Sequence, residues 1–367
     1  MLIIVYLVGF WLLIHGFYQL IKYFIVVRDI KQKYSPHPEY PESKKKHKIS
    51  VFIPVLHEEK ILEKFLTDFS LQDYPSDLFE IFVITTQKEY LNESIKPNTI
   101  DILRKVIAEN RFSNLRIAQI HYPYDSGFKA NQLDFAFKQI LKEKGKNEIE
   151  DTYFLFLDAD SEPDPSTIRR FNDSIEDGIE IYQQPLLWFK NIDVIDNPLM
   201  RSFAFSQSYF SVSYEIPMYA GRFFPWRLKY LVGNGLFIKG SFLSRIGGFP
   251  EIIEDVRIGR LTSFLDTPVK IVPWFGVVET AKNFSIYVKQ SSVWFFGCGL
   301  FVSDYLKAKI LRKNVESKFR DYILLIYGVF KAFRWMNKGL FHLVGLIFSF
   351  IYHSILPSVI RFRNVCI

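Results

Sequence analysis

Short apolar runs alternate with helix-like patterns through the middle of the chain. Four runs of strand length occur at residues 49–55, 79–85, 115–120 and 153–157. Between them, apolar residues recur at helical spacing in residues 58–71, 99–109 and 128–141. Runs of the first kind predict buried strands, and the second spacing predicts amphipathic helices. The alternation over residues 49–185 therefore predicts an α/β fold with a mostly parallel sheet flanked by helices.

The pattern is less regular outside these elements. Residues 142–151 are rich in charge and predict a loop. Residues 186–290 are rich in aromatic side chains and contain few clear elements. Within that region, residues 217–226 predict a loop over the sheet edge, and residues 231–239 predict a glycine-containing turn that enters a strand. A helix with two acids in its first turn is predicted to begin at residue 254.

The first 21 residues contain no charged side chain, and about 20 apolar residues suffice to cross a bilayer as a helix. A cleaved signal peptide is the alternative, but the segment lacks a basic start and a small-residue cleavage site. We therefore predict an N-terminal transmembrane anchor within residues 1–27. Residues 28–48 carry seven Lys or Arg, three acids and three prolines, which predicts a basic linker on the cytoplasmic side.

The C-terminal part combines positive charge with large apolar side chains. Residues 301–338 carry nine Lys or Arg against three acids. This composition favours amphipathic helices that lie in a membrane interface, which we predict over residues 295–338. Residues 339–360 are uncharged over 22 positions and predict a second transmembrane helix.

The overall composition excludes some classes of protein. The net charge of +7 is modest for 367 residues, and no segment resembles a nucleic-acid-binding module, so we expect no nucleic-acid partner. The two cysteines, Cys298 and Cys366, form no metal or redox motif. Apolar residues make up 49% of the chain, which fits a protein that contacts membrane lipids.

The predicted strand at residues 153–157 ends in two acids, Asp158 and Asp160. Open α/β sheets bind their ligands at the carboxyl ends of the strands. Carboxylate oxygens at such a place suit a Mg²⁺ or Mn²⁺ ion that bridges phosphates. An acidic turn without a ligand is the alternative, because Asp, Ser and Pro are common turn residues.

Six segments, in this order, carry a resemblance to a known family. They are Ile53–Glu59 (IPVLHEE), Leu71–Pro75 (LQDYP), Ser126–Leu133 (SGFKANQL), Asp158–Asp160 (DAD), Ile253–Asp255 (IED) and Gln290–Trp294 (QSSVW). With them the chain resembles the membrane-bound family 2 glycosyltransferases of the inverting, nucleotide-sugar-dependent type. The resemblance implies a GT-A-like domain at residues 49–294. It also implies an integral membrane protein whose catalytic domain faces the cytoplasm.

The resemblance implies roles for the residues at these positions. Asp255 would be the catalytic base that takes a proton from the acceptor hydroxyl. The residues implied to bind the donor are Glu58, Thr85, Lys129, Asp158 and Asp160. Two of these, Asp158 and Asp160, would hold a divalent metal, Mn²⁺ or Mg²⁺. The residues implied to bind the acceptor are Glu254, Gln290, Trp294, Gly233 and Asn234.

Several of these residues have a plainer alternative role. Asp255 and Glu254 could simply stabilise the start of a helix, as acids at helix starts do. Trp294 could anchor the chain at a membrane interface instead of stacking on a sugar. Gly233 and Asn234 also suit an ordinary tight turn. Lys129 could be a surface lysine at a helix start.

Two positions depart from the family pattern. The family usually has an Asp after the second strand that reads the nucleotide base, but Ile84–Glu89 contains none. The missing Asp weakens the inference that the donor is a UDP-sugar, although a UDP-sugar stays the favoured donor. The usual Arg before the signature Trp is Val293, and Lys289 or Arg222 could compensate for it.

We therefore predict an inverting hexosyltransferase that moves a sugar from a nucleotide-diphosphate donor to a lipid-linked or membrane-proximal glycan acceptor. One alternative is a processive polysaccharide synthase of the same family, but two predicted spans make a pore within one chain hard to build. The other is a catalytically degenerate membrane protein that only binds sugar nucleotides. The presence of Asp158, Asp160 and Asp255 disfavours it. The oligomeric state is not predicted.

Overall fold

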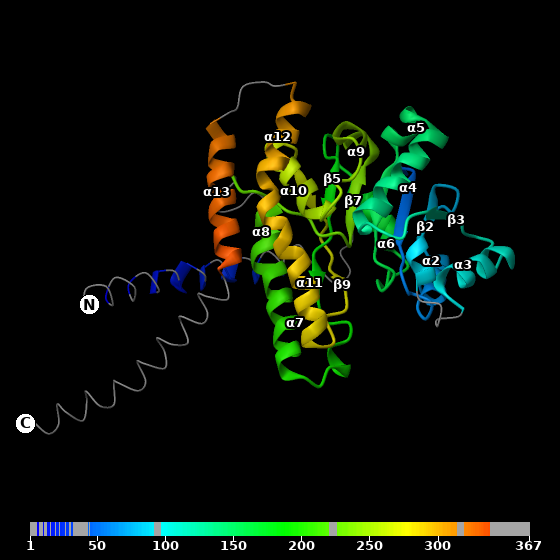
Figure 1. Cartoon of the computed structure of the whole chain (residues 1–367), viewed down its shortest axis with the longest axis horizontal. Helices are drawn as coiled ribbons and strands as arrows, with labels where there is room; N and C mark the ends of the chain where they lie inside the picture. Colours follow the sequence, from blue (N-terminus) through cyan, green and yellow to red (C-terminus); the bar gives the residue numbers. More distant parts are fainter. Residues whose placement is uncertain are drawn as a thin grey trace, which may run out of the picture.

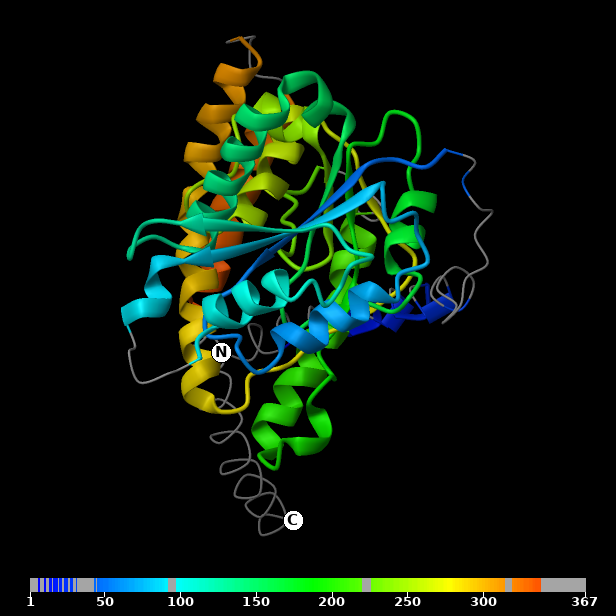
Figure 2. The same ribbon diagram turned by 90° about the vertical axis from the view of Figure 1, so that its right-hand side faces the viewer.

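A seven-stranded sheet forms the centre of the protein, in the strand order β3-β2-β1-β4-β7-β5-β8. The computed structural model describes residues 45–91, 97–219, 226–313 and 319–337, together with Ser43 and scattered positions between Tyr6 and Lys31. The strands of the sheet are β1 (Ile49–Pro54), β2 (Phe79–Thr86), β3 (Ile117–Tyr122), β4 (Tyr153–Phe156), β5 (Ile181–Gln183), β7 (Leu236–Lys239) and β8 (Val269–Ile271). Only β7 runs antiparallel to its neighbours β4 and β5. The predicted mostly parallel sheet is confirmed (Figure 2).

Helices cover the sheet and extend beyond one of its edges. They are α2 (Leu62–Ser70), α3 (Thr99–Ala108), α4 (Lys129–Lys144), α5 (Lys146–Asp151), α6 (Thr167–Asp173), α7 (Pro198–Phe210), α8 (Ile216–Tyr219), α9 (Gly240–Ile246), α10 (Glu254–Leu265), α11 (Phe284–Phe296), α12 (Phe301–Leu311) and α13 (Phe319–Met336). The shorter elements are β6 (Leu186–Leu187), β9 (Gly276–Val277), the 3₁₀ helices η1 (Gln87–Leu91), η2 (Ile192–Val194) and η4 (Gly297–Leu300), and the π-helix η3 (Ser211–Glu215).

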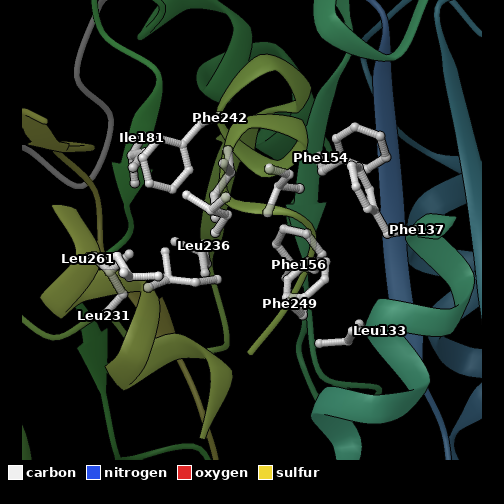
Figure 3. Packing of buried hydrophobic residues seen from close by; sticks show 14 of the residues in the cluster. Leu133, Phe137, Phe154, Phe156, Ile181, Leu231, Leu236, Phe242, Phe249 and Leu261 are labelled. Carbon is white, nitrogen blue, oxygen red and sulfur yellow. The ribbon is translucent and has the colours of Figure 1, made fainter. Parts of the chain in front are cut away.

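The central strand β1 explains why the sheet is buried on both faces. Its side chains alternate between two apolar clusters, because successive residues of a strand point to opposite faces. Val51 packs with residues of α2, α3 and α6 on one face. Phe52 packs on the other face with residues of α4, α9 and α10, such as Phe137 and Phe242. Figure 3 shows part of this second cluster, in which Phe154 and Phe156 of β4 face α4.

The helix α10 joins the sheet domain to the C-terminal helices. Figure 1 shows α10, α12 and α13 together at the end of the molecule opposite α2 and α3. The Asp304 carboxylate of α12 is fully buried and accepts a hydrogen bond of 2.7 Å from Arg257 Nε of α10. It accepts another, of 3.3 Å, from the buried Arg260 of the same helix. Two cations from α10 therefore surround one anion from α12.

Residues 142–151 do not form the loop that we predicted from their charge. The helix α4 continues to Lys144, and α5 begins at Lys146 after Gly145, whose φ is +79°. Lys and Glu are good helix formers, and Ile149 of α5 is buried. The loop prediction is wrong because it rested on the charge of these residues alone. Helix α7 also lies in a region that we expected to be irregular, and α8 covers the start of the loop predicted at residues 217–226.

The predicted localisation is wrong for the part of the chain that the structure describes. In that part, no helix has both the length and the apolar character needed to cross a bilayer. The expected integral membrane protein with its catalytic domain facing the cytoplasm is therefore not supported. The predicted span at residues 339–360 lies outside the described residues, as does most of the anchor at residues 1–27. The segment predicted as interfacial, residues 295–338, does contain helices, α12 and α13.

We predict that Asp304→Asn strongly destabilises the protein. The variant leaves two largely buried guanidinium groups without their anion, which costs about 3–5 kcal/mol. Glu63→Gln is the matched control, because Glu63 pairs with Arg111 at the surface and such pairs contribute at most about 1 kcal/mol. Urea unfolding of both variants measures the difference. Equal losses in the two variants would show that the Asp304 network does not hold α10 to α12.

Candidate active site

Two acids follow β4 at the carboxyl end of the sheet, as the sequence predicted. Leu157 continues the ladder with a 3.2 Å hydrogen bond to the carbonyl oxygen of Phe52 in β1. The chain then turns, and the turn is braced by the side chain of Asn234. The Asn234 Oδ1 atom accepts hydrogen bonds from the Asp158 N–H at 3.3 Å and from the Ser161 hydroxyl at 3.0 Å. Asn234 therefore braces the Asp158 turn, and its contact with the acceptor stays a prediction.

Lys129 lies where three elements meet. It is the first residue of α4, and its ammonium group forms an ion pair with Asp158. A Cβ atom built on Gly233 would lie 3.4 Å from Lys129 Nζ, 3.4 Å from Asp255 Oδ2 and 3.7 Å from Glu254 Oε1. Burial lowers the pKa of Lys129, but the three surrounding carboxylates outweigh burial, so its pKa is raised. The structure thus brings together residues 129, 158, 233, 254 and 255, which are far apart in the sequence.

The carboxylate of Asp255 is fixed by the backbone. Its Oδ2 atom accepts a 2.8 Å hydrogen bond from the Gly233 N–H, and Oδ1 accepts one of 2.7 Å from the Val256 N–H. Burial nevertheless raises the pKa of Asp255, because it outweighs these bonds and the charge of Lys129. A carboxylate that is oriented, partly exposed and more basic than usual can take a proton from a bound hydroxyl group.

Three further carboxylates are held at unusually high pKa values. Burial, followed by repulsion from Asp255, raises the pKa of Glu254 to about 7. Burial, followed by repulsion from Asp160 and Asp158, raises the pKa of Glu58 to about 7. Burial and Asp158 likewise raise the pKa of Asp160 to about 6. Negative charge is therefore crowded at this edge of the sheet.

The donor atoms present suit a divalent cation that is shared with a ligand. In the described part of the chain, no group of three or more His, Cys, Asp or Glu side chains could hold a metal ion alone. Asp158 and Asp160 would supply carboxylate oxygens, and phosphate oxygens or waters would supply the remaining ligands, as Mg²⁺ and Mn²⁺ accept. The mutual repulsion of these acids fits such an ion, because a cation between them would relieve it.

Lys190 is a site residue that sequence reasoning missed. Its ammonium group donates a hydrogen bond to the carbonyl oxygen of Asp160 and lies 3.5 Å from Glu162 Oε1. Its backbone N–H donates to the carbonyl oxygen of Val278, so the β6–β9 segment positions it. No motif surrounds Lys190 in the sequence, and only the pairing of β6 with β9 could have indicated its place. It adds a second cation beside the Asp158 turn.

Two predicted acceptor residues lie on α11. Gln290 is exposed, and no hydrogen bond between described residues joins it to the carboxylates. The ring of Trp294 packs edge-to-face on Trp188, with 6.2 Å between the ring centroids. Trp188 is two residues before Lys190 in the sequence, so this tryptophan pair adjoins the segment that carries the second cation. Arg222, a possible substitute for the missing Arg, lies outside the described residues.

Thr85, predicted to bind the donor, is engaged within the sheet. Its hydroxyl group lies 3.1 Å from His121 Nδ1 and accepts a 2.9 Å hydrogen bond from Gln119. His121 Nε2 also lies 3.1 Å from Gln87 Oε1. Thr85, Gln119 and His121 lie within β2 and β3, and Gln87 directly follows β2, near the place where the family's base-reading Asp would be expected. A contact between Thr85 and a nucleotide base stays a prediction.

Comparisons with known proteins identify relatives of this chain. Residues 50–231 match the sequence model of the family described as Glycosyl transferase family 2. A curated protein of Methanococcus voltae is 23% identical over 317 residues, which are 85% of this chain and 81% of that protein. It is described as dolichyl N-acetyl-alpha-D-glucosaminyl phosphate 3-beta-D-2,3-diacetamido-2,3-dideoxy-beta-D-glucuronosyltransferase.

A solved structure confirms the fold. The mannosyltransferase of Pyrobaculum calidifontis, in complex with GDP-Man and Mn²⁺, matches with a TM-score of 0.52 at 14% sequence identity. The match covers 87% of this chain and 89% of that chain. The predicted GT-A-like arrangement of a mostly parallel sheet flanked by helices is therefore confirmed.

The crowded acids give a prediction about stability and pH. Glu254 keeps its proton to about pH 7 in the folded state, whereas the usual value for Glu is 4.5. The folded state therefore binds more protons than the unfolded chain between these values, so stability falls as pH rises toward 7. Glu254→Gln removes this cost, and we expect a stabilisation of about 1–3 kcal/mol at pH 8.

Urea unfolding at pH 5.5 and pH 8 measures this effect. Glu251→Gln is the control, because Glu251 is an exposed acid of the same segment. The wild type and this control should lose stability between the two pH values, and Glu254→Gln should lose less. A Glu254→Gln variant that is less stable than wild type at pH 8 would contradict the prediction.

Proposed function

Because residues 50–231 belong to glycosyl transferase family 2, we propose that this protein transfers a sugar from a nucleotide-diphosphate donor to an acceptor hydroxyl group, with inversion at the sugar carbon. The observation that carries the proposal is the meeting of Lys129, Asp158 and Asp255 around Gly233. This arrangement sets one oriented base beside one cation and the acids of the β4 turn. It offers both functions that such a transfer needs, deprotonation of the acceptor and stabilisation of the leaving group.

Asp255 acts as the general base. It removes the proton of the acceptor hydroxyl as the oxygen attacks the anomeric carbon and the bond to the diphosphate breaks. The two backbone hydrogen bonds from Gly233 and Val256 hold the carboxylate in place, so that little reorganisation is needed. A single base with attack opposite to the leaving group inverts the configuration at that carbon.

Charge at the β4 turn serves the departing diphosphate. A divalent ion held by Asp158 and Asp160 would supply positive charge to the phosphates. Lys129 orients Asp158 and provides positive charge from the protein itself. Lys190 adds a second cation near Asp160. The Mn²⁺ in the mannosyltransferase structure and its GDP-Man ligand support this type of donor, and a UDP-sugar is the favoured choice here.

The acceptor is a sugar linked to a lipid through phosphate. The curated relative supports this choice, because its description contains a dolichyl-linked sugar phosphate. Glu254, Gly233, Gln290 and Trp294 are the residues that we propose for the acceptor side. Glu254 lies beside Asp255 and keeps its proton to about pH 7, so it can donate a hydrogen bond to an acceptor oxygen near neutral pH.

We predict nucleotide release in a panel of nucleotide sugars that contains Mn²⁺ and a lipid extract as the source of acceptor. Asp255→Asn keeps the shape of the side chain but removes the base, and we expect kcat to fall by about 10² to 10⁴. Glu251→Gln should keep the wild-type rate. An Asp255→Asn variant with the wild-type rate would refute the assignment of the base.

The same panel distinguishes the alternatives. A processive synthase would give products with many added sugars, whereas the proposed enzyme adds one. A degenerate protein would bind a nucleotide sugar without releasing nucleotide, with or without acceptor. Binding measured by calorimetry would then remain while turnover was absent from every donor tested.

The metal gives a separate prediction. Treatment with EDTA should abolish turnover, and Mn²⁺ or Mg²⁺ should restore it. Asp160→Asn removes a proposed metal ligand, so we expect its apparent Mn²⁺ affinity to fall at least about tenfold. Asp164→Asn is the control from the same segment, because Asp164 pairs with Arg170 rather than with a residue of the site. Full activity in EDTA would exclude a metal requirement.

A further inference from the structure

The residue before the two acids of α10 has a strained backbone. Ile253 lies in the left-handed region, with φ of 51° and ψ of 57°. This conformation is unfavourable for a β-branched side chain and persists only where the surroundings enforce it. Ile253 is buried and directly precedes Glu254 and Asp255. Its conformation therefore sets the direction in which α10 begins.

The 3₁₀ turn η4 supplies the surroundings that hold Ile253. Gly297 in this turn lies so close that a Cβ atom built on it would be 2.6 Å from Ile253 Cδ1. The other nearest atoms of Ile253, Cβ and Cγ2, would both be 3.6 Å away, which is ordinary contact. Only one methyl group of Ile253 therefore depends on the absence of a side chain at position 297.

The same turn is bonded directly to α10. The carbonyl oxygen of Gly297 accepts a 2.7 Å hydrogen bond from the Arg260 guanidinium group, which is buried. Arg260 also pairs with Asp304, so the turn, α10 and α12 share one network. Gly297 thus contacts α10 at two places: the residue before its first turn and, through its carbonyl oxygen, a side chain near its middle.

We propose that Gly297 and Ile253 are positioning residues for the Asp255 carboxylate. The contact between them keeps Ile253 in the left-handed conformation, and this conformation aims Asp255 at the backbone N–H of Gly233. The inference rests on the proposed function, because it concerns the geometry of the proposed base. The position of Asp255 matters because proton transfer depends steeply on the distance between the base and the acceptor hydroxyl group.

The test compares two glycines of the same turn. Gly297→Ala places a methyl group 2.6 Å from Ile253 Cδ1, so the Ile253 side chain must shift, and we expect kcat to fall by about tenfold with an unchanged KM for the nucleotide sugar. Gly299→Ala is the matched control, because a Cβ atom there would meet nothing within 4 Å. It should keep the wild-type kcat.

Rescue separates positioning from general damage to the fold. Ile253→Val removes the Cδ1 atom and leaves the atoms that are in ordinary contact. The variant alone loses the close contact with Gly297, and its kcat is the reference for the double variant. In the double variant Gly297→Ala, Ile253→Val, the added methyl group finds room, and most of the lost kcat should return. Unfolding in urea, measured on the wild type and on all four variants, shows whether each is folded.

Two outcomes overturn the inference, and they are distinguishable. If the wild type is active and Gly297→Ala keeps its kcat, or if Ile253→Val fails to rescue a folded Gly297→Ala, the positioning role is wrong and the proposed function stands. If the wild type releases no nucleotide from any donor, the proposed function fails and the inference falls with it.

Discussion

The site depends on a crowding of negative charge that the fold does not neutralise. Asp158 raises the pKa values of Glu58, Asp160, Glu254 and Asp255 by repulsion, and burial is the largest cause of each of these shifts. Lys129 and Lys190 compensate only in part. Such an arrangement of carboxylates is unfavourable in the protein alone. It becomes more favourable when a cation and the hydroxyl group of an acceptor bind beside the carboxylates. Relief of this repulsion would therefore favour the binding of ligands at this edge of the sheet.

Rigid elements are needed to keep these acids together. The sheet fixes the Asp158 turn, because β4 lies next to β1 and is buried on both faces. Helix α10 approaches the loop before β7 closely at Gly259, where an added Cβ atom would lie 2.4 Å from the Cα atom of Tyr230. The fully buried Asp304 ties the same helix to α12. Repulsion therefore has no easy route of relief through movement of α10.

The sequence predicted those parts of the fold and site that local patterns encode. Strand ends, the acids after β4 and the acids opening α10 all have local signals, and the structure brings Lys129, Asp158 and Asp255 together. Lys190 had no such signal, because the long-range pairing of β6 with β9 positions it. The motif did not indicate that the amide of Asn234 also braces the Asp158 turn. The loop predicted at residues 142–151 is wrong, because the helix propensity of its Lys and Glu residues and the burial of Ile149 outweigh its polarity.

Backbone strain and charge repulsion meet at the start of the same helix, α10. Repulsion from the other acids pushes on Glu254 and Asp255 at the start of α10. The packing of Gly297 on Ile253 and the hydrogen bond from Arg260 to the Gly297 carbonyl oxygen join that helix to the C-terminal elements. A change in α12 or η4 therefore reaches the proposed base through packing alone, without contact with any ligand. Under the proposed positioning role, the C-terminal helices would influence the proposed base Asp255 through these contacts with α10.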